Sequence, residues 1–307
     1  MKHSVLITIL LIAMFFIAQL IGIAVVSVYS PQTIEVTNDN GQIENQTIYN
    51  LPYGLDPPPE NNPSSNLISI VVALAVAITL IFFLMKFNAE IFLRLWFFIV
   101  IALALGISLN AAVINIPYST LIVLILAIPL AYFKIFKPNM IVHNITELLI
   151  YPGIAAIFVP LLNVFTIIIL LIFISLYDMY AVWHSGFMQK MANYQIKTLK
   201  LFSGFFIPYL RNKEKVTIVK NKSKSIKSKS VKVNVAILGG GDVVFPIMVA
   251  GVVLRQFSLI PALIVALCAT LALAGLFYIS EKGKFYPAMP FISVGCFIAL
   301  GIIHWLY

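Results

Sequence analysis

The sequence predicts an all-α, polytopic membrane protein with nine transmembrane helices. Of its 307 residues, 61% are hydrophobic and only 10% are charged, whereas a soluble domain carries about 25% charged residues. A helix needs about 20 apolar residues to cross a bilayer. The stretches that meet this length are 4–28, 67–87, 91–112, 118–136, 147–165, 166–184, 233–254, 258–279 and 286–306.

The first of these stretches is interpreted as an uncleaved anchor rather than a signal peptide. Lys2 supplies the basic start that both would have. The apolar run that follows is longer than the 7–15 residues, roughly, of a signal peptide.

The distribution of Lys and Arg predicts how the helices are oriented. If the N-terminus is cytoplasmic, 19 of the 20 basic residues fall on the cytoplasmic side, and Arg255 alone falls outside. Such an excess marks the cytoplasmic loops of membrane proteins. We therefore expect a multi-pass protein of the cell membrane with a cytoplasmic N-terminus and an extracytoplasmic C-terminus. The expected outer loop, 29–66, has no Lys or Arg and five acids, and its Asn45-Gln46-Thr47 matches a glycosylation sequon.

Three parts follow from this topology: helices 1–6 in 1–184, a basic cytoplasmic loop in 185–232, and helices 7–9 in 233–307. The net charge of +9 comes from residues between apolar spans, so it predicts membrane topology and no nucleic-acid binding. The Lys- and Ser-rich end of the loop predicts a mobile segment.

Two short β-like runs flank that mobile segment, Val216–Val219 and Val231–Val235. One interpretation is a hairpin whose Val231, Val233 and Val235 edge pairs with an extended peptide. The alternative is a solvated tether that touches anionic lipid.

Two of the eleven acids carry the functional argument. Five acids lie in the outer loop and three in cytoplasmic connections, and Glu147 is interpreted as opening the fifth helix with Asn144 as its cap. Asp178 and Asp242 remain inside apolar helices, where an ionisable side chain costs at least about 2.5–3.5 kcal/mol. No Lys or Arg lies within either span, so each acid has mainly the other as an interaction partner.

Both aspartates are expected at the same depth, roughly 10–15 Å from the cytoplasmic surface at 1.5 Å per residue. Two carboxyls a few ångströms apart share a proton. One can then activate a water and the other can protonate a leaving amide nitrogen. The same pair would equally suit a proton or cation transporter. The run Gly239-Gly240-Gly241 before Asp242 allows close helix packing or close approach of a substrate.

Metal and cofactor chemistry is not expected. Cys268 and Cys296 lie in apolar segments without CxxC spacing. The four histidines are scattered singly, without metal-ligand spacing.

Three motifs in order resemble those of one family. Tyr177-Asp178, Gly239-Gly240-Gly241-Asp242 and Pro287-Ala288-Met289 are similar to the YD, GxGD and PAL motifs of the presenilin and signal peptide peptidase family of intramembrane aspartyl proteases, particularly its archaeal presenilin homologues. Met289 stands where the family has Leu, a residue of similar volume. Pro287 would also simply suit the first turn of a helix.

The resemblance implies a presenilin-like fold of nine helices. It also implies hydrolysis of peptide bonds within the transmembrane helices of membrane proteins, with Asp178 and Asp242 as catalytic residues. Pro287, Ala288 and Met289 would shape the cleft, and Tyr177 would lie beside the catalytic acid. A non-enzymatic membrane chaperone is a third alternative. The charge count favours the presenilin orientation, with the loop between the aspartates in the cytoplasm.

Overall fold

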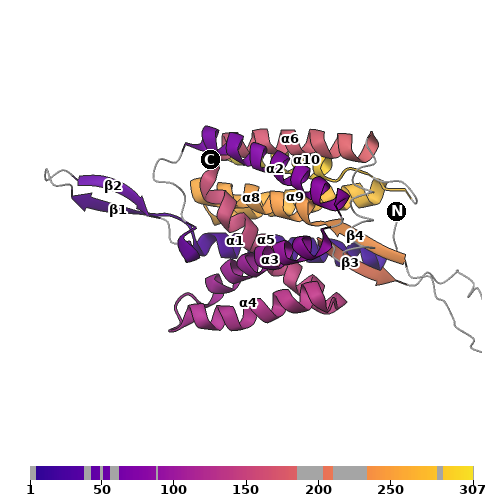
Figure 1. Ribbon diagram of the computed structural model, residues 1–307. Coiled ribbons are helices and arrows are strands. Elements are labelled where there is room, and N and C mark those ends of the chain that lie inside the picture. Colours follow the sequence, from indigo (N-terminus) through magenta and orange to yellow (C-terminus); the bar gives the residue numbers. More distant parts are fainter. Residues whose placement is uncertain are drawn as a thin grey trace, which may run out of the picture.

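A computed structural model describes residues 5–37, 43–48, 51–55, 62–87, 89–184, 203–209, 234–281 and 286–306. Within these ranges the fold is a bundle of α-helices whose two chain ends lie at opposite ends of the bundle (Figure 1). The helices are α1 (Val5–Val28), α2 (Pro63–Lys86), α3 (Glu90–Val113), α4 (Ser119–Phe136), α5 (Met140–Phe158), α6 (Val164–Trp183), α8 (Gly240–Gln256), α9 (Leu259–Ile279) and α10 (Met289–Leu306).

Eight of the described helices are long and apolar enough to cross a membrane. The predicted polytopic helical fold is therefore confirmed. The exception is α8, which has only 17 residues. It replaces the predicted seventh span at 233–254, because the first part of that apolar run forms a strand.

The boundary between the fifth and sixth helices differs from the predicted one. α5 ends at Phe158 and a short 3₁₀ helix, η2 (Val159–Leu161), follows it. Asn163 then begins α6 with a capping box: its Oδ1 accepts from Thr166 N at 2.8 Å, and Thr166 Oγ1 accepts from Asn163 N at 2.9 Å. These reciprocal bonds satisfy the free amides at the start of the helix, so the chain breaks there.

The predicted cap at Asn144 is wrong. α5 begins two turns before Glu147, and Asn139 is its cap, with Oδ1 accepting from Ile141 N at 3.0 Å. Asn144 and Glu147 lie inside the helix, where their polar atoms contact a strand. Hydropathy alone suggested a later start because these polar residues interrupt the apolar run.

Two antiparallel hairpins lie at opposite ends of the bundle (Figure 1). The first, β1 (Gln32–Thr37) with β2 (Ile43–Ile48), is in the predicted outer loop, and β2 contains the Asn45 sequon. The second pairs β3 (Gly204–Tyr209) with β4 (Asn234–Gly239). Its first strand differs from the predicted partner, Val216–Val219, which lies outside the described residues.

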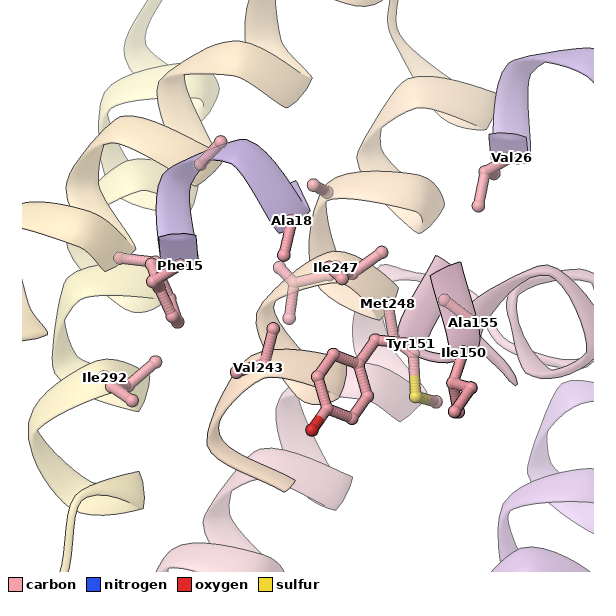
Figure 2. Close-up of a cluster of buried hydrophobic side chains, with 14 of the residues drawn as sticks. Phe15, Ala18, Val26, Ile150, Tyr151, Ala155, Val243, Ile247, Met248 and Ile292 are labelled. Carbon is pink, nitrogen blue, oxygen red and sulfur yellow. The ribbon is translucent and has the colours of Figure 1, made fainter. Parts of the chain in front are cut away.

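The core forms where α1, α5, α8 and α10 meet. Figure 2 shows side chains from all four helices converging, among them Phe15, Tyr151, Ile247 and Ile292. Small residues let the helices approach closely, as in other membrane bundles. A Cβ on Gly153 of α5 would overlap the Ala104 carbonyl oxygen of α3, and one on Gly22 of α1 would overlap Ile247. This core fixes α8, the helix that carries Asp242.

Candidate active site

Asp178 lies near the end of α6 and is bound by the start of α10. Its side chain is buried, 5% exposed. Its Oδ2 accepts a hydrogen bond from the backbone amide of Met289 at 3.1 Å, and the Ala288 amide also contacts the carboxyl. The first amides of a helix have no partner within the helix, so the start of α10 has a free donor for this carboxylate.

A second contact fixes α6 against α10 one turn away. The Ser175 and Ser293 hydroxyls lie 2.8 Å apart. Ser175 precedes Asp178 by one turn, and Ser293 follows Met289 by one turn. The two pairs of contacts therefore set the rotation of α6 that points Asp178 at α10.

The predicted PAL-like segment lies next to Asp178, but α10 begins later than the predicted residue 286. Pro287 is buried and precedes the helix, and Met289 is its first residue. Pro290, not Pro287, occupies the first turn, so the interpretation of Pro287 as a first-turn proline is wrong. The Met289 side chain is buried in the core. Only its backbone amide binds Asp178.

Asp242 lies in the first turn of α8, after the strand β4. Its carboxyl folds back toward the preceding turn, where a Cβ on Gly239 would lie 3.1 Å from Asp242 Oδ2, and the Gly239 backbone amide contacts it. The N-terminus of a helix favours a negative charge at this position. The start of α8 thus binds Asp242 in a way similar to that in which the start of α10 binds Asp178.

The two aspartates face the same part of the bundle. α6 packs against α8, and the Asp178 and Asp242 carboxyls lie within electrostatic range of each other. Sequence placed them at one depth but left their rotation open. In the structure the helices that carry them, α6 and α8, pack against each other.

The three glycines before Asp242 have different surroundings. Gly240 is buried, and a Cβ there would lie 2.9 Å from both Ser203 Oγ and Tyr151 Cε1. Gly241 is exposed, and the nearest atom to its Cβ position is Phe245 Cε2 at 3.8 Å. Gly240 is therefore needed for packing, whereas Gly241 leaves open space beside Asp242.

Gln19 of α1 is a polar residue at the site that sequence reasoning missed. It is fully buried, and its Nε2 donates to the Val243 carbonyl at 3.1 Å. Val243 directly follows Asp242, so this bond fixes α1 to the first turn of α8. A lone amide inside an apolar span was the signal that could have indicated it.

The remaining predicted site residues are less central. Tyr177 is next to Asp178 in sequence, and its ring is exposed on α6. Val231 and Val233 lie outside the described residues. Val235 is in β4, opposite Pro208 of β3.

The backbone of β3 is bound by side chains of α5. Asn144 Nδ2 donates to the Phe206 carbonyl at 3.0 Å, and Asn144 Oδ1 accepts from Phe206 N at 3.1 Å. One turn away, His143 Nε2 bonds the Gly204 carbonyl at 2.8 Å, and Glu147 Oε1 accepts from Gly204 N at 3.3 Å. The backbone groups of Gly204 and Phe206 therefore point at α5 and away from β4.

This arrangement determines which groups of β4 are free. Phe206 pairs with Ile237, and Gly204 pairs with Gly239. In an antiparallel pair, residues opposite each other either both bond across the ladder or both point outward. Ile237 therefore directs its N–H and C=O groups to the outer edge of β4, as does Gly239, whose amide contacts the Asp242 carboxyl there.

No metal site is formed in the described ranges, because no three His, Cys, Asp or Glu side chains there are grouped to hold an ion. A pair of carboxyls in this arrangement suits general acid–base chemistry.

Comparisons with known proteins agree with this geometry. The family model described as signal-peptide peptidase, presenilin aspartyl protease matches residues 54–305. Among curated proteins, none matches this chain in sequence. Two solved structures, both titled as a presenilin family intramembrane aspartate protease and differing in space group, are similar in fold. One has a TM-score of 0.64 at 18% identity, covering 98% of this chain and 99% of that one. The other has a TM-score of 0.61 at 19% identity, covering 97% of each. Because the family model matches most of the chain and the fold agrees over nearly all of it, the protein belongs to the signal-peptide peptidase and presenilin aspartyl protease family.

Proposed function

We propose that Asp178 and Asp242 are the catalytic pair of this intramembrane aspartyl protease, of the GxGD type. The observation that supports the proposal is that two carboxyls from distant parts of the chain lie within electrostatic range of each other, each beside the start of a helix. The fold and family give no support to the alternative of a carboxylate-dependent proton or cation transporter.

The chemistry follows from a proton shared by the pair. The ionised aspartate takes a proton from a water, whose oxygen attacks the scissile carbonyl carbon. The protonated aspartate donates to the carbonyl oxygen as the tetrahedral intermediate forms. On its collapse the aspartate that took the water proton gives it to the leaving nitrogen, the other aspartate recovers a proton from a hydroxyl of the intermediate, and the C–N bond breaks. Each aspartate acts as acid and as base in turn, so the roles belong to the pair.

The substrate proposed is a transmembrane helix of another membrane protein, unwound at the cleavage position. A peptide bond inside an intact helix has its backbone groups already paired and shielded. An unwound segment needs new partners, and the outward N–H and C=O groups of Ile237 are suitable ones. This places the pairing edge at β4, continuing from the predicted Val231–Val235 run, and β4 leads directly to Asp242.

The site motif has distinct proposed roles. Gly239 accommodates the Asp242 carboxyl, Gly240 permits the packing of α8, and Gly241 leaves space for substrate backbone. Pro287 and Ala288 place the start of α10, whose Met289 amide binds Asp178.

The decisive experiment is cleavage of a labelled single-span substrate in detergent and in vesicles. Asp178→Asn and Asp242→Asn keep the side-chain size and are expected to abolish cleavage while leaving the protein folded. Retained cleavage in either variant would reject the pair. Ion flux through vesicles that disappears in Asp178→Asn, without any proteolysis, would instead support the transporter.

We also propose the cell membrane as location, with a cytoplasmic N-terminus, an extracytoplasmic C-terminus, and a division into 1–184, 185–232 and 233–307. The charge asymmetry of the loops supports this orientation. Translation into glycosylating microsomes tests it. A mass shift that Asn45→Gln abolishes is expected, and modification of a sequon introduced after residue 185 would contradict it.

A further inference from the structure

A buried ionic cluster lies on α4 and α5, outside the aspartate pair. Lys134 Nζ donates to Glu147 Oε1 at 2.6 Å, with side chains only 4% and 1% exposed. Lys134 Nζ also lies 3.4 Å from His143 Nδ1. The predictions treated Lys134 as a topology-setting charge and Glu147 as the start of a helix. Neither explains why both charges are taken out of water, which is costly.

The hydrogen bonds define the state of His143. An ammonium can only donate and a carbonyl can only accept. Nδ1 therefore accepts from Lys134, and Nε2 carries the proton that is donated to the Gly204 carbonyl at 2.8 Å. His143 thus links the ionic cluster to the backbone of β3.

Both backbone groups of Gly204 are bound by this cluster, since Glu147 accepts from Gly204 N at 3.3 Å. Gly204 has φ +146, a conformation that favours glycine. Asn144 binds both backbone groups of Phe206 in the same way. We call Lys134, His143, Asn144 and Glu147 the β3 anchor, because together they occupy the outer edge of β3 as a third strand would.

Two contacts connect the β3 anchor to Asp242. Gly204 pairs with Gly239, the residue that caps α8 and contacts the Asp242 carboxyl. The Ser203 carbonyl accepts from Gly240 N at 3.3 Å, and Ser203 Oγ and Tyr151 leave no room for a side chain at Gly240. The beginning of β3 therefore sets the position of the first turn of α8.

We propose that the β3 anchor positions Asp242 for catalysis and closes the β3 edge, so that β4 has the open edge for substrate. The inference rests on the proposed catalytic role of Asp242. The four side chains act through β3, so they are positioning residues. They come from α4 and α5, two transmembrane helices, whereas β3 lies within the 185–232 segment and β4 follows it.

The expected effect is on turnover. A displacement of about 1 Å of a catalytic group can cost on the order of 10²-fold in rate. Asn144→Leu removes both bonds to Phe206 without leaving a buried charge, and it is expected to lower kcat by about tenfold or more. Because a displaced Asp242 shares its proton with Asp178 differently, the pH profile of kcat is expected to shift as well.

A second variant tests the ionic part of the anchor. Glu147→Gln alone leaves Lys134 as an unpaired buried charge and can fail to fold. The double variant Lys134→Met with Glu147→Leu removes both charges and keeps apolar volume, so it is expected to fold. It loses the acceptor for Gly204 N, and the same fall in kcat and shift of the pH profile are expected.

The matched control is Asn110→Leu. Asn110 is buried on α3 and donates to Tyr29 Oη at 3.1 Å, at the end of the bundle where β1 and β2 lie. This variant is expected to lower the thermal stability but to leave kcat per folded protein and the pH profile unchanged. Cleavage is measured on the monodisperse fraction from gel filtration, so that loss of folded protein does not count as loss of turnover.

The outcomes separate the two proposals. If Asp242→Asn is inactive but Asn144→Leu and the double variant both keep the wild-type kcat and pH profile, the β3 anchor is structural only and the inference is wrong. If Asp242→Asn still cleaves substrate, the proposed function itself fails. A fall in kcat of the same size in Asn110→Leu would also overturn the inference, because any buried bond would then have this effect.

Discussion

The carboxylate of Asp178 is bound by the first backbone amide of α10, with Met289 N donating to Asp178 Oδ2 at 3.1 Å. The contact joins residues 111 positions apart in the sequence. It gives the Pro287-Ala288-Met289 segment a physical role, which is to begin a helix at the place where its free amide meets the aspartate. Because the donor is a backbone group, the identity of the side chain at position 289 matters only for packing.

Met289 therefore gives the first prediction. Met289→Leu keeps the amide and a similar volume, so cleavage is expected to stay within about twofold of wild type. Met289→Pro removes the N–H at a helix position that accepts proline. A hydrogen bond to a charged group is worth about 1.5–3 kcal/mol, so a loss of cleavage of about tenfold or more per folded protein is expected, beside the fall in melting temperature that loss of the buried Met289 side chain causes. Equal cleavage by the two variants would contradict the role of the amide.

The outer edge of β4 gives the second prediction. Ile237 points its N–H away from β3, so Ile237→Pro removes an edge donor without breaking the hairpin, as proline does on edge strands. Cleavage of the transmembrane substrate is expected to fall at least about tenfold, with the fold intact by circular dichroism. Ala236→Pro is the control that breaks the β3–β4 ladder, and it is expected to reduce stability too. Unchanged cleavage by Ile237→Pro would reject pairing along this edge.

The glycine run gives the third prediction. Gly240→Ala places a methyl group against Ser203 and Tyr151 and is expected to cost about 1–3 kcal/mol of stability. Gly241→Ala has space and gains helix propensity of up to about 1 kcal/mol. Its melting temperature in detergent is expected to match or exceed that of wild type. The space beside Gly241 is the space proposed for the substrate backbone, so a methyl group there is expected to slow cleavage. A wild-type rate in Gly241→Ala would argue against close approach of the substrate to Gly241.

Helix packing gives the fourth prediction. Gly153→Ala forces α5 away from the Ala104 carbonyl of α3, and a loss of about 1–3 kcal/mol is expected. Gly301→Ala on α10 meets nothing within 4 Å and should be neutral or slightly stabilising. Thermal unfolding of both variants in the same detergent checks this. A similar destabilisation of the two would show that glycine loss itself, and not the α3–α5 contact, is responsible.

Much of the fold was predictable because hydropathy reports how long an apolar run is. Eight helices in the described residues follow from this property alone. The seventh apolar run, 233–254, was predicted as one helix because a short apolar strand and the start of a helix have the same hydropathy. Only the pairing of β4 with β3, a contact across the whole loop, distinguishes them.

The residues of the site likewise divide into those that the sequence indicated and those that it did not. Asp178 and Asp242 were conspicuous in the sequence because each is a lone carboxylate in an apolar span. Lys134 and Glu147 were not, since each lies near the end of an apolar run and seemed accounted for by a loop or a cap. They are buried beside β3, whose Gly204 lies 57 residues after Glu147 in the sequence. A contact at that separation cannot be predicted from a local sequence pattern.

The short length of α8 has a consequence for hydration. Its 17 residues extend about 26 Å, less than the hydrocarbon layer of about 30 Å, and β4 directly precedes it. Exposed peptide groups are not tolerated against acyl chains. We expect the outward amide and carbonyl of Ile237 to be solvated when no peptide is paired with β4, so the proposed substrate edge is also the expected route by which water reaches Asp242.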